Sequence, residues 1–350
     1  MSPRKVLVIT GKSASLMNVG RDIAMVLQKH DYIPRLFNYV IHYLDAVEIG
    51  DSAIFVYPVS PIFSAKVMLA YRDFKLHGGL DRCFYATIEG KVDMKVVQHW
   101  MRRDCSFVAN SRYTAEKLME AGFSVEGVVY HGLIPEIVEE ARKLAKGYRN
   151  RIERDHPDKV TFCVVSTTHK RKGLQYLVEA VKILERKRDD FIVHLLTTKE
   201  GSRQIEGSKC LEVIPKYGTR PRTEVLAWIG GHHFMIIPSL AEGFCLPLIE
   251  ANAMGVPVIH CEYPPLSEIS DNSINITFDY EDVDYLDVHE GILYELHLYN
   301  PIELARCMEY AIEMYKKDYD NYVKISEKAK EVINKFNAEE LYVELTKYIK

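Results

Sequence analysis

The 350-residue sequence has no apolar stretch that approaches the roughly 20 residues of a membrane-spanning helix. It also has no strong excess of either charge: the formal net charge is −4 at pH 7, which argues against nucleic acid as a partner. The N-terminal segment MSPRKVLVIT has only a short apolar run and leads directly into a strand pattern, which is not typical of a signal peptide. We therefore expect a cytoplasmic protein.

Paired cysteines are missing as well. The seven cysteines are scattered, and no two form a C-x-x-C pair. An odd, dispersed set that lies mostly in apolar segments, such as TFCVVS and VIHCEY, is typical of reduced core thiols. Hydrophobic residues make up 47% of the chain and charged residues 27%, so we expect a globular rather than a disordered protein. Lys and Glu are frequent and Gln is scarce, which indicates a heat-adapted source.

Short apolar, β-branched runs alternate with longer helical patterns, and this alternation occurs twice along the chain. Examples are KVLVIT and SAIFVYP in the first half and VTFCVVS and HFMIIPS in the second. Strands that are apolar throughout, each followed by a helix, predict parallel sheets covered on both faces. The length suits two domains of ~150 residues each. We predict an α/β protein with two Rossmann-like, doubly wound domains that face a cleft.

The domain boundary is expected in ARKLAKGYRNRIERDHPDK, residues 141–159. This segment is polar and charged and contains Gly and Pro, as linkers often do. The predicted organisation is an N-terminal domain 1–145, a linker 146–159, a C-terminal domain 160–325 and a terminal helix 326–350.

The segment KVLVITGKSASLMNVG, residues 5–20, ends its apolar run in Gly-Lys-Ser, as a phosphate-binding loop does. The P-loop pattern G-x-x-x-x-G-K-[ST] would need a glycine where Val6 stands, and the dinucleotide pattern G-x-G-x-x-G is also absent. We expect a loop of small residues, including Ser13, and a helix that begins near Gly20. Such a loop could receive an anion, and an ordinary surface loop is the alternative.

The most informative segment is FMIIPSLAEGFCLPLIEANAMGVPVI, residues 234–259. A strand pattern ends at Ser239, and Pro247 marks the start of a helix. Glu242 and Glu250 are eight positions apart and flank this helix start, where free backbone amides would face the same pocket. Carboxylates bind sugar hydroxyls and amides bind phosphate oxygens, so the pattern suits a sugar nucleotide. The alternative is that acidic residues merely favour a first helical turn.

EGFCLPLIEANAMGVPVI resembles the signature of retaining glycosyltransferases of the GT-B fold, family 4, with its E-x7-E spacing. STTHKRKGLQYLVEAVKIL resembles the first strand-to-helix loop of that family's C-terminal domain, and FVANSRYTAEKLMEAGFSVEGVVYHGL resembles the end of its N-terminal domain. VINKFNAEELYVELTKYI resembles the terminal helix that crosses back to the first domain. The resemblance covers most of the chain and is strongest over residues 105–265.

The resemblance implies transfer of a hexosyl group from a UDP-, GDP- or ADP-sugar with retention at the anomeric carbon, without a metal or further cofactor. It makes Glu242 and Lys172 the catalytic residues, with Glu242 on donor sugar hydroxyls and Glu250 on the ribose. Lys172 would bind the diphosphate and stabilise the leaving group together with the amides of Gly243, Phe244, Cys245 and Leu246. Gly20 would let the first domain approach the same diphosphate.

The sequence departs from the family pattern in two places. The family usually has an arginine four or five positions before the lysine, where Thr167 and Ser166 stand here; the candidates to replace it are His169, Lys170, Arg171, Arg220 and Arg222. A mid-domain histidine of many members is not evident in YATIEG, which contains Glu89. Candidates for contacts with the acceptor or diphosphate are therefore His131, Glu89, His77, Ser13 and His169. A structural role is the alternative for each histidine.

The acceptor is expected to be a glycan, a lipid-linked molecule or a small molecule. FSAKVMLAYRDFKLHGG and MKVVQHWMRRD are amphipathic, and peripheral contact with an anionic inner membrane face is one interpretation. Ordinary surface helices are the other. The basic and aromatic residues concerned are Lys66, Arg72, Lys75, Lys95, Trp100, Arg102 and Arg103.

Other functions stay open. Asp282 and Asp284 form a D-x-D like the metal motif of the other glycosyltransferase fold, although a solvated acidic loop is the simpler interpretation. A nucleotide-sugar epimerase or a glucan synthase would share the fold. A sugar-nucleotide-binding protein without turnover is the alternative from another class. The sequence predicts no oligomeric state.

Overall fold

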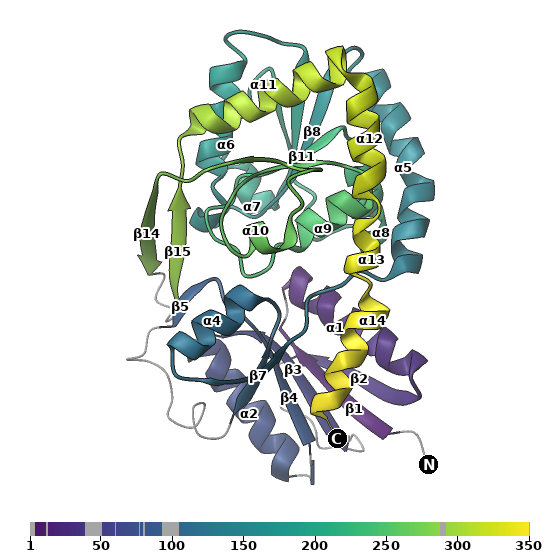
Figure 1. The fold of residues 1–350 in the computed structure, drawn as a ribbon, viewed down its shortest axis with the longest axis vertical. Helices are drawn as coiled ribbons and strands as arrows, with labels where there is room; N and C mark the ends of the chain where they lie inside the picture. The colour runs from purple at the N-terminus through teal and green to yellow at the C-terminus, as the bar shows by residue number, and fades with distance from the viewer. Residues whose placement is uncertain are drawn as a thin grey trace. The chain divides into compact units, whose positions relative to one another are not determined.

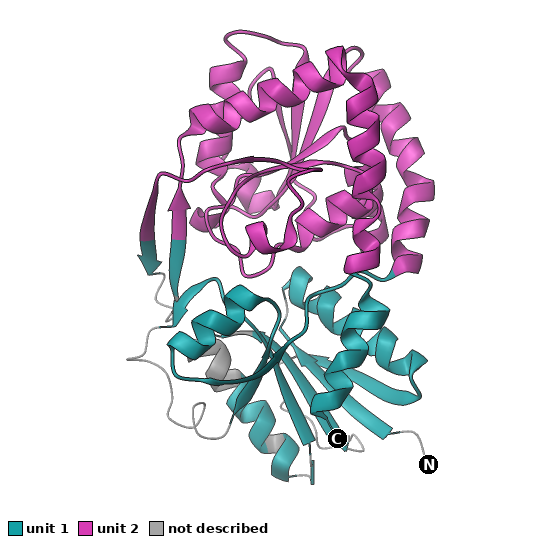
Figure 2. Ribbon diagram, viewed as in Figure 1, with its two compact units in different colours: residues 1–134, 285–295, 336–350 teal, residues 135–284, 296–335 magenta. Residues whose placement is uncertain are grey.

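A computed structural model describes residues 4–11, 13–38, 51–59, 61–76, 78–79, 81–92, 105–287 and 292–349. The chain divides into two compact units (Figure 2). Unit 1 contains residues 1–134, 285–295 and 336–350, and unit 2 contains residues 135–284 and 296–335. Each unit is built on a six-stranded parallel sheet with helices, so the predicted pair of Rossmann-like α/β domains is confirmed.

The sheet of unit 1 has the strand order β2-β1-β3-β4-β6-β7 (Figure 1). Its strands are β1 (Arg4–Thr10), β2 (Tyr32–Asn38), β3 (Ser52–Pro58), β4 (Asp81–Thr87), β6 (Ser106–Ala109) and β7 (Ser124–Val128). Its helices are α1 (Ala14–Lys29), α2 (Pro61–Leu76), α4 (Arg112–Glu120), α14 (Ala338–Val343) and the 3₁₀ turn η2 (Glu344–Tyr348). Stacked Phe55 and Phe84, with ring centroids 5.1 Å apart, lie in the core between the sheet and its helices.

The sheet of unit 2 has the order β10-β9-β8-β11-β12-β13. Its strands are β8 (Val160–Val165), β9 (Phe191–Leu196), β10 (Leu211–Ile214), β11 (Phe234–Ile237), β12 (Val258–Cys261) and β13 (Ile276–Phe278). Its helical elements are α5 (Pro135–Asp155), η1 (Lys170–Lys172), α6 (Leu174–Leu184), α7 (Lys199–Ser202), α8 (Arg222–Gly230), α9 (Leu246–Ala253), α10 (Leu266–Ile269), α11 (Pro301–Lys317), α12 (Tyr319–Ala329) and α13 (Val332–Lys335). Every residue of β9, β11 and β12 is buried, which explains why their sequences are apolar on both faces except at His194 and His260.

A small third sheet has the order β14-β15-β5. It consists of β14 (Asp282–Asp287), β15 (Ile292–Leu298) and β5 (Gly90–Val92). β15 pairs with β5 in antiparallel fashion, and Tyr294 lies opposite Gly90. A side chain at Gly90 would approach the carbonyl oxygen of Leu293 to 2.1 Å, so this pairing requires glycine. Among the described residues, no helix combines the length and the apolar character needed to cross a membrane.

The boundary between the units differs from the predicted linker. Residues 146–155 form the second half of α5, a 21-residue helix that lies wholly in unit 2, and unit 1 ends its first segment at Ile134. Only Val138, Ala141 and Ile152 of α5 are buried, so its exposed face carries the charge that suggested a linker. The terminal segment is also divided, because residues 326–335 belong to unit 2 and residues 336–350 to unit 1.

The predicted start of the first helix near Gly20 was wrong. Helix α1 begins at Ala14, and the Ser13 side chain caps it by accepting from the Leu16 N–H at 3.4 Å. Gly20 lies inside the helix, where an added Cβ would lie 3.0 Å from side-chain atoms of Thr10 and Leu36. Gly20 therefore allows α1 to pack closely on β1 and β2, and it is not at a helix N-terminus facing a phosphate. Lys12 lies outside the described residues.

Candidate functional site

The loop between β11 and α9 is held in place by hydrogen bonds to its backbone carbonyl groups. Four consecutive carbonyl groups, those of residues 238–241, each accept a hydrogen bond. The donors, in order, are the Tyr299 hydroxyl at 2.8 Å, the Tyr263 hydroxyl at 2.8 Å, the His297 N–H at 2.8 Å and the Arg171 Nη1 at 3.1 Å. The loop lies at the carboxyl end of a central strand, where parallel α/β sheets bind ligands. It therefore presents the next residue, Glu242, in a fixed position.

Glu242 is a buried carboxylate with two cationic partners. Its side chain is 7% exposed, with Oε1 2.5 Å from Lys172 Nζ and Oε2 3.4 Å from Arg171 Nη1. Burial raises the pKa of Glu242, but Lys172, Arg171 and a hydrogen bond from Ser239 outweigh it and hold the pKa below its ordinary value. Glu242 is thus an ionised hydrogen-bond acceptor near neutral pH rather than a proton donor.

Gly173 explains how Lys172 reaches Glu242. It has φ +60°, a left-handed conformation, and a Cβ added there would lie 2.0 Å from the carbonyl oxygen of Pro238. The loop after β8 therefore packs directly on the loop after β11, and the Leu240 N–H donates to the Arg171 carbonyl at 2.7 Å. A glycine after Lys172 therefore has a steric reason.

His169 caps η1 and lies beside the same cations. Its Nδ1 accepts from the Arg171 N–H at 3.3 Å. Burial, followed by Arg171 and Lys172, lowers the pKa of His169 to about 4. The ring is therefore neutral at pH 7 and adds no charge to the site.

Glu250 forms an ion pair with a different arginine. Arg222, the first residue of α8, donates from Nε to Glu250 Oε1 at 3.1 Å, and both side chains are 12% exposed. Tyr217 belongs to this neighbourhood: burial, then Glu250 and Glu242, raise the pKa of its hydroxyl. Tyr217 is a lone tyrosine in a loop and belongs to no sequence motif, so the sequence alone did not indicate it.

The N-terminus of α9 forms the third part of the site. Cys245, its N-cap, has φ 80° and ψ 64°, a left-handed conformation that costs a non-glycine residue roughly 1–2 kcal/mol. Within the described part of the chain, the N–H groups of Gly243 and Cys245 donate to no protein acceptor. Phe244 and Cys245 are buried, and Leu246 begins the helix. The helix start thus offers amides to an anion.

These three parts make unit 2 suited to a ligand that carries both hydroxyl and phosphate groups. The cations Arg171, Lys172 and Arg222 exceed the carboxylates Glu242 and Glu250 by one charge. Of the candidates for the missing family arginine, the structure brings Arg171 to Glu242 and Arg222 to Glu250. Lys170 is exposed and Arg220 is half-buried.

In unit 1, the candidate His131 is part of a buried neutral network. Its Nδ1 lies 2.9 Å from the Tyr85 hydroxyl and its Nε2 lies 3.2 Å from Asn110 Nδ2. Because both ring nitrogens have protein partners, this arrangement favours a structural role. Glu89 is half-buried just before β5, and Ser13 caps α1. His77 lies outside the described residues.

Two further sequence interpretations concern surface segments. Asp282 and Asp284 are exposed in strand β14, so the segment is a strand rather than the expected acidic loop. Helix α2 carries exposed Leu69 and Leu76. The side chain of Lys66 and the whole of the second amphipathic segment, with Lys95, Trp100, Arg102 and Arg103, lie outside what the structure describes. Membrane contact stays a prediction.

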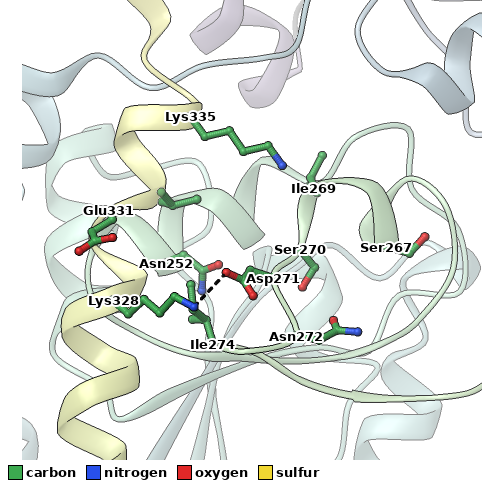
Figure 3. A pocket seen from close by; sticks show the side chains of 11 residues that line it. Asn252, Ser267, Ile269, Ser270, Asp271, Asn272, Ile274, Lys328, Glu331 and Lys335 are labelled. Atoms are coloured by element: carbon green, nitrogen blue, oxygen red, sulfur yellow. Dashed lines mark ion pairs between the residues drawn. The ribbon is translucent and has the colours of Figure 1, made fainter.

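A separate pocket of about 520 Å³ lies in unit 2 beside α12 and α13 (Figure 3). Lys328 Nζ and Asp271 Oδ2 are 3.6 Å apart across it. None of the predicted site residues lines this pocket, so it is distinct from the Glu242 region.

Comparisons with known proteins point to glycosyltransferases. The family described as glycosyl transferases group 1 matches residues 158–287, which include Lys172, Glu242 and Glu250. An uncharacterized glycosyltransferase of Sulfolobus islandicus rod-shaped virus 1 is 26% identical over 342 residues, 97% of this chain and 98% of the relative. The matches support a glycosyltransferase.

Solved structures share the fold over nearly the whole chain. A glycosyltransferase from Rickettsia africae has a TM-score of 0.70 at 16% sequence identity. The alignment covers 99% of this chain and 97% of the Rickettsia chain. Anabaena HepE, solved in complex with UDP-glucose, has a TM-score of 0.67 at 13% sequence identity. The alignment covers 98% of this chain and 99% of the HepE chain. The fold is therefore that of GT-B glycosyltransferases.

Proposed function

We propose that this chain is a retaining glycosyltransferase that moves a hexosyl group from a nucleoside diphosphate sugar to a glycan, lipid-linked or small-molecule acceptor. The observation that carries the proposal is the buried Glu242–Lys172–Arg171 cluster beside the α9 N-terminus. The match of residues 158–287 to the group 1 glycosyl transferases supports it, since that segment contains the cluster.

In this proposal the donor lies across both carboxylates. Ionised Glu242 accepts hydrogen bonds from hydroxyls of the transferred sugar, and Glu250, oriented by Arg222, accepts from the ribose. The diphosphate binds to Lys172, Arg171 and the amides of Gly243 to Leu246. The ammonium group of Lys172 has three N–H donors, so it can keep its contact with Glu242 and reach a phosphate oxygen.

The reaction breaks the bond between the anomeric carbon and the β-phosphate oxygen while the acceptor oxygen bonds to the same face of the carbon. The leaving phosphate takes the acceptor's proton, and the products are the glycoside and the nucleoside diphosphate. Lys172 and Arg171 stabilise the negative charge that grows on the leaving oxygen, the electrostatic contribution we expect to be largest. The excess of cations over carboxylates supports a reaction in which the protein itself supplies this charge, without a metal.

The first experiment is a thermal-shift screen of UDP-, GDP- and ADP-sugars, followed by assays of nucleoside diphosphate release. UDP-glucose is the first donor to test, because HepE was solved with it. An epimerase would isomerise the donor sugar without net transfer, and a binding protein would shift the melting temperature without turnover. Transfer with retained anomeric configuration, read by NMR, supports the proposal; binding without release or transfer would overturn it.

Peripheral membrane contact is a second, separate proposal about the acceptor. It predicts co-sedimentation of the full chain with anionic liposomes at low salt and its loss at high salt, because surface charges are screened. The absence of binding at low salt would end this proposal and favour a glycan or small-molecule acceptor.

A further inference from the structure

A cluster of three metal-ligating side chains lies in unit 2 among residues that the proposed transferase site does not use. His156 follows α5, His194 is in β9 and Glu212 is in β10. His194 and Glu212 are register partners in adjacent parallel strands, so their side chains leave the same face of the sheet. His156 reaches this face from the end of α5.

The distances between the ligand atoms match a tetrahedral zinc site. His194 Nε2 and His156 Nε2 are 3.1 Å apart, and each lies 3.6 Å from Glu212 Oε2. Ligand atoms that each lie about 2.0–2.1 Å from a tetrahedral zinc ion are about 3.3–3.4 Å from one another. The three atoms therefore form one face of a coordination tetrahedron with little need for adjustment.

A chain of hydrogen bonds directs a lone pair of His194 toward this face. The Trp228 carbonyl can only accept, so His232 Nδ1, 2.8 Å away, donates to it. His232 is fully buried, and in its neutral form its Nε2 accepts from His194 Nδ1 at 2.9 Å. His194 Nε2 is then the unprotonated nitrogen, and it faces His156.

His194 and His232 are both buried, so the groups around them fix the orientation of each ring. Metal-ligating histidines usually donate their second ring N–H to a fixed partner, which orients the ring and sets the tautomer. His232 and the Trp228 carbonyl supply this support.

We propose that His156, His194 and Glu212 bind a zinc ion, with water as the fourth ligand. His194 is 5% exposed, whereas His156 is 23% and Glu212 54% exposed, which gives the ion a route from solvent and leaves room for the water. Two imidazoles and one carboxylate suit zinc and similar transition metals and not Mg²⁺ or Ca²⁺, which prefer oxygen ligands. The ion ties the end of α5 to β9 and β10 and stabilises unit 2.

The test uses the full chain without a histidine tag, treated with chelator and then titrated with ZnCl₂ by calorimetry. We expect one equivalent to bind, a rise in melting temperature, and visible absorption bands of tetrahedral Co²⁺ when CoCl₂ is added instead. MgCl₂ should produce none of these changes.

Two ligand variants, Glu212→Gln and His156→Gln, change residues that are partly exposed and should leave the fold intact. Each should weaken zinc binding by more than the about 10–100-fold typical of changes in supporting residues. The matched controls are Glu206→Gln, whose side chain is 86% exposed in the same unit, and His30→Gln, which is exposed in unit 1. Controls should bind zinc like the wild type.

Saturable binding that is lost in both ligand variants and kept in both controls supports the site. No saturable binding by the wild type, or equal binding by the ligand variants, would overturn it and leave a hydrogen-bonded histidine chain. Sugar transfer by Glu212→Gln should match the wild type, so the zinc site and the transferase proposal can fail independently.

Discussion

Each unit buries a polar network at the carboxyl ends of its parallel strands, and the two networks differ in charge. In unit 1 the Tyr85 hydroxyl donates to the Val129 carbonyl at 2.7 Å, and His131 bridges Tyr85 and Asn110. In unit 2 the carboxylate of Glu242 lies between Lys172 and Arg171. The network of unit 1 satisfies its donors and acceptors internally, whereas that of unit 2 has an excess of positive charge. The two units share a related fold but differ in buried charge, and this difference is the reason that we place the proposed donor site in unit 2.

The largest expected effect comes from removing the charge at the centre of the unit 2 network. Glu242→Gln keeps the shape of the side chain but loses the anion that accepts from sugar hydroxyls and balances Lys172. We expect kcat for transfer to fall by about 10²–10³-fold, comparable to the loss of one preorganised transition-state contact. Nucleotide binding, measured by calorimetry, should largely survive. Full activity in this variant would show that the charged network is not the catalytic one.

Replacing a cation of the same network should affect nucleotide binding. Lys172→Ala should weaken binding of the nucleoside diphosphate by about 1–3 kcal/mol, the range of a lost charge-assisted hydrogen bond. Lys170→Ala is the matched control, because Lys170 is exposed in the same turn. Calorimetry measures the nucleoside diphosphate affinity of both variants. Equal losses of affinity in both would mean that binding depends on general positive charge and not on the position of Lys172.

The neutral network of unit 1 should respond through stability rather than chemistry. His131→Gln removes a ring that bridges buried polar groups and should lower the free energy of unfolding by about 1–3 kcal/mol. At a temperature where the variant is folded, kcat should be unchanged. Chemical denaturation and steady-state kinetics test both parts; a fall in kcat with normal stability would give unit 1 a direct part in the reaction.

The smallest effect is a difference in acid sensitivity between the units. Burial, as the main cause, lowers the pKa of His260 to about 4 and that of His233 to about 3, and both lie in unit 2. Between about pH 6.5 and these lowered pKa values, the histidines are protonated in the unfolded state but not in the folded state. The contribution that the neutral rings make to the free energy of unfolding is therefore present above about pH 6.5 and is lost as the pH falls.

Hydrogen exchange, corrected for its intrinsic pH dependence, measures this difference. Amides of β9 in unit 2 should lose protection between pH 6.5 and 4 before those of β1 in unit 1. Equal losses in both strands would contradict the prediction and indicate that the buried histidines do not control acid unfolding.

The sequence predicted the parallel α/β architecture of both units, because buried parallel strands need continuous apolar runs and these runs are local. It also selected the loops that contain Lys172 and Glu242, through a resemblance carried by closely spaced residues. It misplaced the start of α1, since Gly20 was taken as a helix start when its lack of a side chain serves packing on Thr10 and Leu36. It also took the exposed face of α5 for a linker.

The sequence by itself determined which segments become strands and helices and which residue types follow the strands. Only the tertiary structure decided which of several cations meets which carboxylate, since Arg171 and Glu242 are 71 positions apart and Arg222 and Glu250 are 28 apart. It likewise assembled His156, His194 and Glu212 from one helix end and two strands. Contacts of this kind depend on strand order and on backbone positions such as Gly173, whose φ of +60° lets two loops touch. Local sequence patterns carry no information about which distant residues such packing brings together.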